Sequence, residues 1–97
     1  MKEYKVDIEI WQVGEHDKND YRLYFDHEMI LERTWTLPPG MEYQIVHLTH
    51  NLIPGNHSIQ LENIDGTLEL GKISINNKPV EHKKIPSYRR DRAYFEL

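Results

Sequence analysis

Apolar and polar residues alternate along most of this 97-residue chain. A period of two is typical of a β-strand with one buried face, whereas a helix repeats its apolar face every three to four residues. The pattern is clearest in residues 4–10, where one face consists of Tyr4, Val6, Ile8 and Ile10. The sequence therefore predicts an all-β fold, and no segment predicts a helix.

Turn-forming residues separate the alternating segments into short strands. The predicted strands span residues 4–13, 21–25, 29–37, 42–50, 57–63, 67–76 and 92–97. Six to eight strands in a chain of this length predict one small antiparallel β-sandwich that is jelly-roll-like, with a small barrel as the alternative. We assign residues 1–82 to the sandwich domain and residues 83–97 to a basic, extended C-terminal arm or a last strand.

Three positions depart from simple alternation. Trp11 directly follows Ile10, which predicts a bulge or a strand end covered on both faces. The apolar phase changes across Gly71, which predicts a bulge there. Both faces of residues 42–50 are largely apolar, which predicts a central, well-covered strand. Tight turns are predicted at Asp26–Glu28 and at 76–79.

The chain has no cysteine, which excludes disulfides, thiolate nucleophiles and cysteine-ligated metal sites. It has no run of 18 apolar residues, and residues 1–10 lack the apolar segment of a signal peptide. We therefore expect a soluble protein with no export signal and no membrane partner.

Charge is distributed unevenly along the chain. Residues 1–71 carry a net charge of −8, whereas residues 72–97 carry +4. This balance suits the tail to bind phosphates or an acidic surface, on another protein, on its own body or on a copy of the chain; a solvated, partly ordered terminus is the alternative. Asp91 and Glu96 interrupt the basic run, so nucleic acid is not the expected partner. The basic residues of the tail include Lys83, Lys84, Arg89, Arg90 and Arg92.

The motifs of catalysis and cofactor binding are missing from the sequence. None of Ser58, Ser74 and Ser87 lies in a G-x-S-x-G motif, and the glycines are isolated rather than gathered in a phosphate-binding loop. His47 and His50 point to opposite faces of a strand, so they do not share a metal ion. Residues 17–20 offer oxygen ligands, but their order fits no EF-hand. We expect no enzyme, no metal and no cofactor.

Residues 51–80 contain a pattern that resembles the closing half of jelly-roll sandwiches of the carbohydrate-binding-module type. Its parts are Pro54–Gly55, Ile59, Leu61, Ile73, Ile75 and Asn76–Asn77. Residues 22–35 resemble the hairpin of such modules, so the likeness covers residues 21–80. The resemblance implies a sugar site built from aromatic rings and polar groups. The candidates are Tyr24, whose ring is in the outward phase, Trp35 and Asn56.

A small sandwich without an export signal also resembles the accessory structural proteins of tailed bacteriophages. This resemblance implies a non-enzymatic virion protein, a capsid decoration protein or a tail or neck component, made in the host cytoplasm. Such a protein docks onto a major structural subunit, or forms a homo-oligomer, through a sandwich face and the C-terminal arm. The expected partner-binding residues are Tyr88, Arg89, Arg90, Arg92, Tyr94 and Phe95. A carbohydrate-binding or receptor-binding module is the alternative.

Overall fold

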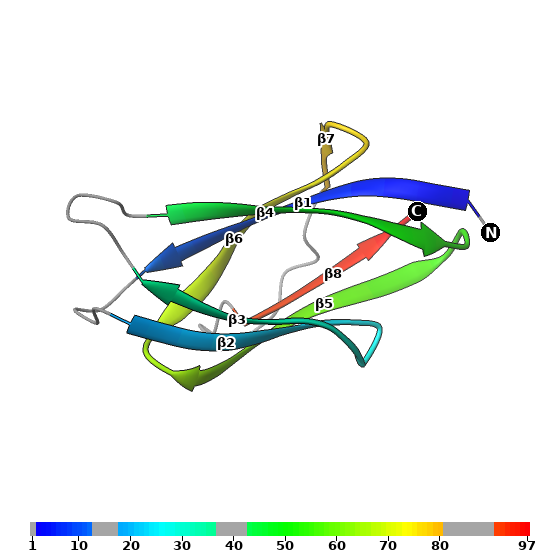
Figure 1. Cartoon of the computed structure of the whole chain (residues 1–97). Helices are drawn as coiled ribbons and strands as arrows, with labels where there is room; N and C mark the ends of the chain where they lie inside the picture. Colours follow the sequence, from blue (N-terminus) through cyan, green and yellow to red (C-terminus); the bar gives the residue numbers. More distant parts are fainter. Residues whose placement is uncertain (1, 13–17, 37–42, 81–90) are drawn as a thin grey trace.

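The computed structural model describes residues 2–12, 18–36, 43–80 and 91–97, which form β-strands and their connections (Figure 1). These residues contain no helix of the length and apolar character needed to cross a membrane. The all-β prediction is confirmed. The strands are β1 (Lys2–Gln12), β2 (Lys18–Phe25), β3 (Glu28–Thr36), β4 (Tyr43–Leu52), β5 (Asn56–Asp65), β6 (Leu68–Ile75), β7 (Lys78–Pro79) and β8 (Arg92–Glu96).

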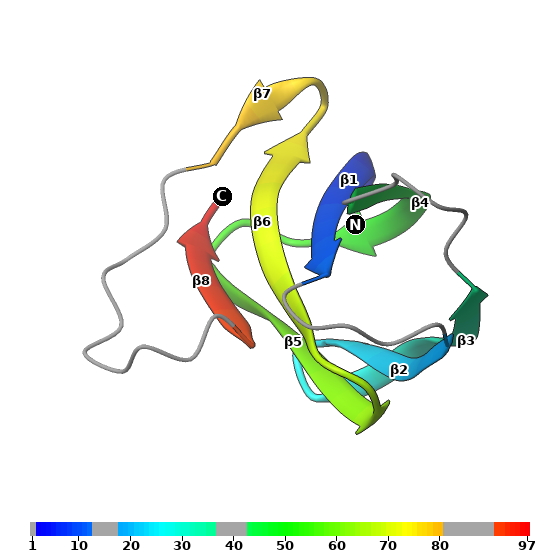
Figure 2. The ribbon, with the colours of Figure 1, turned by 90° about the vertical axis from the view of Figure 1, so that its left-hand side faces the viewer.

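The strands form two antiparallel four-stranded sheets that pack as a sandwich. One sheet, here called the β1 sheet, has the order β4-β1-β6-β7, and the other, the β2 sheet, has the order β3-β2-β5-β8. Figure 2 shows β3 and β4 together on the side of the molecule away from β8. The pairs β1–β4 and β2–β3 are nested, as are β5–β8 and β6–β7. This arrangement confirms the predicted antiparallel β-sandwich.

The core lies between the sheets and is built from the inward residues of each strand. Alternation places these residues on one face of every strand, so the two faces together exclude water. The predicted phase of residues 4–10 is confirmed, because Val6, Ile8 and Ile10 are fully buried. The remaining buried apolar residues are Tyr21, Leu23, Phe25, Trp35, Val46, Leu52, Ile59, Leu61, Leu68, Leu70, Ile73, Ile75, Ala93 and Phe95.

Two tight turns with positive φ join neighbouring strands of the same sheet. Asp26 and His27 connect β2 to β3 with φ of 50° and 69°, and Asn76 and Asn77 connect β6 to β7 with φ of 51° and 66°. A two-residue turn with both φ values positive matches the twist of a hairpin, and Asn, Asp and His tolerate this conformation better than most residues. Both predicted turns are confirmed.

The predicted bulge at Gly71 is also confirmed. Ile8 of β1 pairs with Ile73 of β6, whereas Ile10 pairs with Leu70. An advance of two positions along β1 therefore matches an advance of three along β6, and the extra residue lies at Gly71–Lys72. By contrast, Trp11 pairs in register with Tyr43 and Glu69 near the end of β1, so no bulge forms there, and its side chain is exposed rather than covered.

The prediction that residues 42–50 form a central, covered strand is wrong. Strand β4 lies at the end of its sheet and pairs with β1 alone among the described strands. Its inward face is covered by the core, but Tyr43 and Ile45 on its outer face are exposed. The second apolar face is thus available to solvent or to a partner.

The end of the chain is part of the sandwich. Residues 92–96 form β8, which pairs with β5 and places Ala93 and Phe95 in the core. Reciprocal backbone hydrogen bonds between Gly55 and Leu97, at 3.1 and 2.9 Å, extend this pairing. These residues therefore form a last strand, while 83–90 of the predicted arm lie outside the described residues.

Candidate functional site

Two of the residues predicted to bind a ligand or a partner lie inside the protein. Trp35, a sugar-binding candidate, is 6% exposed, and Phe95, a partner-binding candidate, is 2% exposed. Both side chains fill the core of their own sandwich, so neither presents a ring to a ligand. Those two predictions are corrected accordingly. The candidates Tyr88, Arg89 and Arg90 lie outside the described residues.

The other candidates gather on the outer face of the β2 sheet. Tyr24 pairs across the sheet with Gln60, and Gln60 pairs with Arg92, so the three lie in one row. Tyr94 lies on the same face of the neighbouring edge strand. Asn56 is exposed at the start of β5. The structure thus brings Tyr24, Arg92 and Tyr94 onto one face, although the sequence assigned them to two kinds of site.

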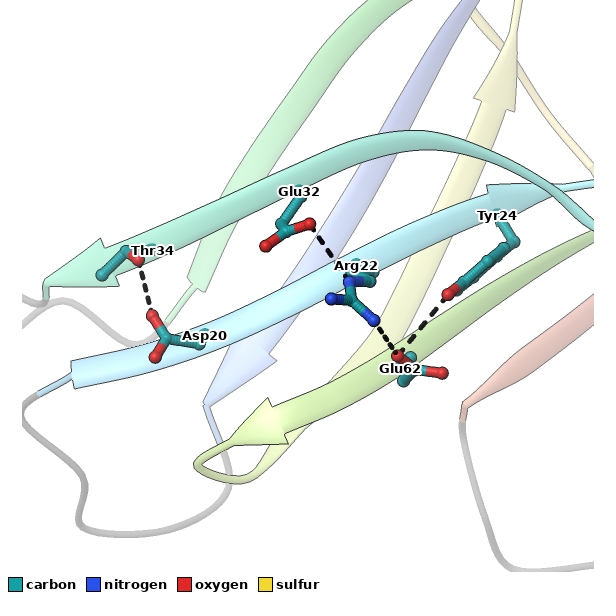
Figure 3. Close-up of polar contacts among 6 residues, drawn as sticks. All are labelled: Asp20, Arg22, Tyr24, Glu32, Thr34 and Glu62. Atoms are coloured by element: carbon teal, nitrogen blue, oxygen red, sulfur yellow. Dashed lines mark hydrogen bonds and ion pairs between the residues drawn. The ribbon is translucent and has the colours of Figure 1, made fainter.

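The charged groups beside Tyr24 contact one another (Figure 3). Arg22 forms ion pairs with Glu32 at 3.1 Å and with Glu62 at 3.2 Å, and the Tyr24 hydroxyl donates to Glu62 at 3.5 Å. The hydrogen bond from Arg22 to Glu32 raises the pKa of the Arg22 guanidinium. Exposed ion pairs of this kind contribute little to stability, because water and salt screen them. These contacts link β2 to β3 and to β5, and they engage the Tyr24 hydroxyl and two of the Arg22 side-chain nitrogens.

The outer face of the β1 sheet carries an exposed apolar patch that consists of Trp11, Tyr43 and Ile45, here called the Trp11 patch. Trp11 pairs with Tyr43 on the adjacent strand, and their rings stack with centroids 4.8 Å apart. Ile45 follows two residues after Tyr43 on the same face. The three side chains are 36%, 46% and 41% exposed, respectively. They form one surface because they occupy adjacent positions on β1 and β4.

The bulge in β6 makes room for the Trp11 indole. A Cβ atom on Gly71 would lie 2.6 Å from Cδ1 and Nε1 of the indole and from Oε1 of Glu9, so a larger residue here would displace these side chains. The indole N–H donates a hydrogen bond to the Glu9 carboxylate. Tyr43, Gly71 and Glu9 therefore hold the Trp11 side chain in one orientation. A ring fixed in this way loses little conformational entropy on binding.

Polar groups surround the Trp11 patch on the same sheet face. A hydrogen bond of 2.5 Å joins His47 of β4 to Asp7 of β1. Glu9 pairs with Ile45, and Glu69 pairs with Trp11 across the sheet. An apolar centre with a polar rim is the usual composition of a protein interface. The patch was missed in the sequence, where Trp11 was interpreted as an irregularity. Its signals in the sequence are the apolar residues Tyr43 and Ile45 in one phase and the glycine at position 71.

A buried histidine links the β2–β3 turn to the β4–β5 connection. The two ring nitrogens of His57 contact a carboxylate oxygen of Asp26 at 2.5 Å and the carbonyl oxygen of Ile53 at 2.7 Å. Burial alone lowers the pKa of His57, but the hydrogen bonds to Asp26 and Ile53 outweigh it, so the pKa is raised. Both nitrogens face acceptors, which favours the doubly protonated ring. With neither nitrogen available to a substrate, this arrangement serves structure rather than proton transfer.

We expect folding stability to depend on pH through His57. A folded-state pKa above the unfolded value of about 6.5 stabilises the protein fully below pH 6.5, and this stabilisation is lost as pH rises through the folded-state pKa. The Asp26→Asn variant keeps a residue that tolerates positive φ but removes the charge. It should lower the free energy of unfolding by about 1 to 2 kcal/mol near pH 6 and by less near pH 8.5. Urea unfolding across this range measures the difference, and an equal loss at both pH values would contradict the assignment.

The chain was compared with known protein families, curated proteins and solved structures. No protein family, no curated protein and no solved structure matches it. Among the described residues, no three His, Asp or Glu side chains come together in a group that could hold a metal ion.

Proposed function

We propose that this protein is a non-enzymatic interaction protein that docks through the outer face of the β1 sheet onto a protein subunit of a larger assembly. The observation that carries the proposal is the Trp11 patch, in which Trp11, Tyr43 and Ile45 form one exposed surface. Single exposed apolar residues are common on proteins, whereas grouped ones indicate interaction sites. Trp and Tyr are also the residues that most often dominate binding energy at interfaces.

The outer face of the β2 sheet supports docking less well. There Arg22 is paired with both Glu32 and Glu62, which leaves one net negative charge, and a partner would have to compensate this charge or leave the three groups exposed to water. On the β1 sheet, the indole N–H is already bonded to Glu9, so a partner can cover the ring without leaving that donor unpaired. The local chemistry therefore favours the β1 sheet as the binding face.

The kind of assembly is proposed from the resemblance to accessory proteins of tailed bacteriophages. In that setting the partner is a major structural subunit of a virion, and the chain is a decoration protein or a tail or neck component. The exposed Arg92 lies on the opposite sheet from the Trp11 patch. A basic contact through Arg92 would thus use a second side of the sandwich.

Replacing Trp11 or Tyr43 by alanine should weaken capture of the partner by about thirtyfold, since truncating a central interface aromatic removes about 2 kcal/mol of binding energy. Tagged wild-type and variant proteins are incubated with lysate of the source cells, and bound proteins are quantified by mass spectrometry. Tyr94→Ala removes an exposed tyrosine from the other sheet and is the matched control. Equal capture by Trp11→Ala and Tyr94→Ala would rule out the patch as the docking site.

Carbohydrate binding is the second candidate, because the stacked rings of Trp11 and Tyr43 lie beside the carboxylate of Glu9. Aromatic faces and carboxylates are groups that contact sugars. The chain has two tryptophans, and a Trp35→Phe variant leaves Trp11 as the sole fluorescent indole. Titration with a panel of glycans then reports on the patch directly. A saturable change in Trp11 fluorescence would replace protein docking with sugar binding, and an unchanged spectrum would support docking.

A further inference from the structure

We infer that the free edge of β4 pairs with β4 of a second copy of this chain, in antiparallel orientation about a two-fold axis. The inference concerns the backbone edge of β4 and stands without the proposed function of the Trp11 patch. Such pairing joins the two β1 sheets into one continuous eight-stranded sheet. It also places two Trp11 patches on a single surface.

Strand β4 is a long and regular edge. All ten residues, Tyr43–Leu52, pair with β1 without a shift in register. No other described strand pairs with its second side. An edge strand of this kind presents a row of backbone N–H and C=O groups that another strand can extend.

Strand β4 also lacks the residues that usually prevent edge pairing. Residues 43–61 contain no Asp, Glu, Lys or Arg, in a chain where 29% of residues are charged. Residues 43–52 contain no Pro and no Gly either. Charged side chains, Pro and bulges are the usual protections of a solvent-exposed edge. A polar edge without them is suited to a partner strand.

The other edges that the structure describes carry such protections. Leu23 and Tyr24 of β2 pair with Leu31 and Met29 of β3, so Ile30 is an extra residue that forms a bulge in β3. Strand β3 also carries three charged residues. Strand β7 has two residues and ends with Pro79, and β8 has five residues, with Arg92 and Glu96 at its ends. Because the other three edges are protected, the unprotected β4 edge is the one suited to pair with another strand.

Charge and symmetry favour a second copy as the occupant. A strand paired with itself about a two-fold axis has matched length and backbone spacing by construction. Each chain has a net charge of −4, so the net electrostatic interaction between two copies is repulsive. Among the described edge strands, β4 is the one at which two copies can pair without bringing like-charged Asp, Glu, Lys or Arg side chains of the paired strands together. His47 on this strand is held by Asp7 of the same chain.

The absence of cysteine makes a direct test simple. Thr49→Cys places the sole thiol on the exposed face of β4, and Thr67→Cys places it on the exposed β5–β6 connection as the control. Mild oxidation should yield a covalent dimer of Thr49→Cys at least tenfold faster than of Thr67→Cys. Ile45→Cys and Asn51→Cys extend the scan along the same face. In a two-fold pairing, the yield peaks at the position nearest the axis.

Sedimentation velocity of the wild-type protein over a concentration series gives the second measurement. The inference expects twice the monomer mass, and Thr49→Lys should shift the protein toward monomer by introducing like charges, while Thr67→Lys should not. A wild-type monomer at every concentration would overturn the inference. So would a dimer that crosslinks equally through Thr49→Cys and Thr67→Cys. Either result leaves the capture experiment on Trp11 unaffected, so the two proposals are tested separately.

Discussion

Replacement of Gly66 by alanine should lower the free energy of unfolding by about 3 kcal/mol, since it combines backbone strain with the loss of a buried polar contact. Gly66 has a φ of +102°, which L-residues rarely adopt, and an added Cβ would lie 2.8 Å from Cγ of Asn19 and overlap its side-chain oxygen. That oxygen accepts a hydrogen bond from the Thr67 N–H at 3.2 Å. Asn19 is fully buried, so it has little freedom to move away.

Gly55→Ala is the matched control for this prediction. Gly55 also has a positive φ, +132°, but an added Cβ there meets nothing within 4 Å. Its replacement should cost about 1 kcal/mol, from backbone strain alone. Urea unfolding of the two variants separates the strain from the steric contact. Equal losses would show that Asn19 yields to the new methyl group and that the contact is unimportant.

Replacement of Phe95 by alanine should cost about 3 to 5 kcal/mol, the usual range for removing a buried phenylalanine. Phe95 packs edge-on against Phe25, with ring centroids 5.8 Å apart, and contacts the His57 ring at 5.9 Å. Its neighbour Tyr94 points to the outer face and is 39% exposed. Tyr94→Ala should therefore change stability by less than about 1 kcal/mol.

This pair of variants tests whether β8 belongs to the fold. Thermal unfolding of Phe95→Ala and Tyr94→Ala measures the difference between two adjacent residues of one strand. A small loss for Phe95→Ala would mean that β8 detaches readily and that the last residues act as an arm. The expected large loss means that any removable arm ends before residue 92.

Local patterns predicted most of the strands and turns. Alternation in residues 4–10 requires only the period of a strand and one buried face, so it identified β1 and its inward side chains. The turn at Asp26–His27 follows from residue types that tolerate positive φ. The Gly71 bulge was predicted because one extra residue restores the apolar phase. These features depend on neighbours in the sequence, and the sequence states them directly.

The position of β4 in its sheet was beyond local patterns. An apolar outer face is expected both of a strand covered by its own chain and of a strand whose cover is a partner. Tyr43 and Ile45 look alike in the sequence under either arrangement. Only the pairing of β4 with β1 alone separates the two.

The aromatic candidates Trp35 and Phe95 are buried in the core. Trp35 is in the same phase as Leu31, which faces the core, so its burial agrees with the alternation, whereas its selection as a sugar ligand followed the resemblance. Polar contacts between distant residues were also missed. The His57–Asp26 bond spans 31 residues and the Thr67–Asn19 bond spans 48. Such pairs depend on which strands become neighbours.

The central claim is that the Trp11 patch docks the protein onto a larger assembly. Its most direct test is sedimentation of lysate from the source cells, in which the wild-type chain and a Trp11→Ala/Tyr43→Ala variant are followed by mass spectrometry. We predict that the wild-type chain sediments with a large particle, also in the presence of competing sugars, and that the variant remains at the top of the gradient. Slow sedimentation of both proteins, or fast sedimentation of both, would contradict the claim.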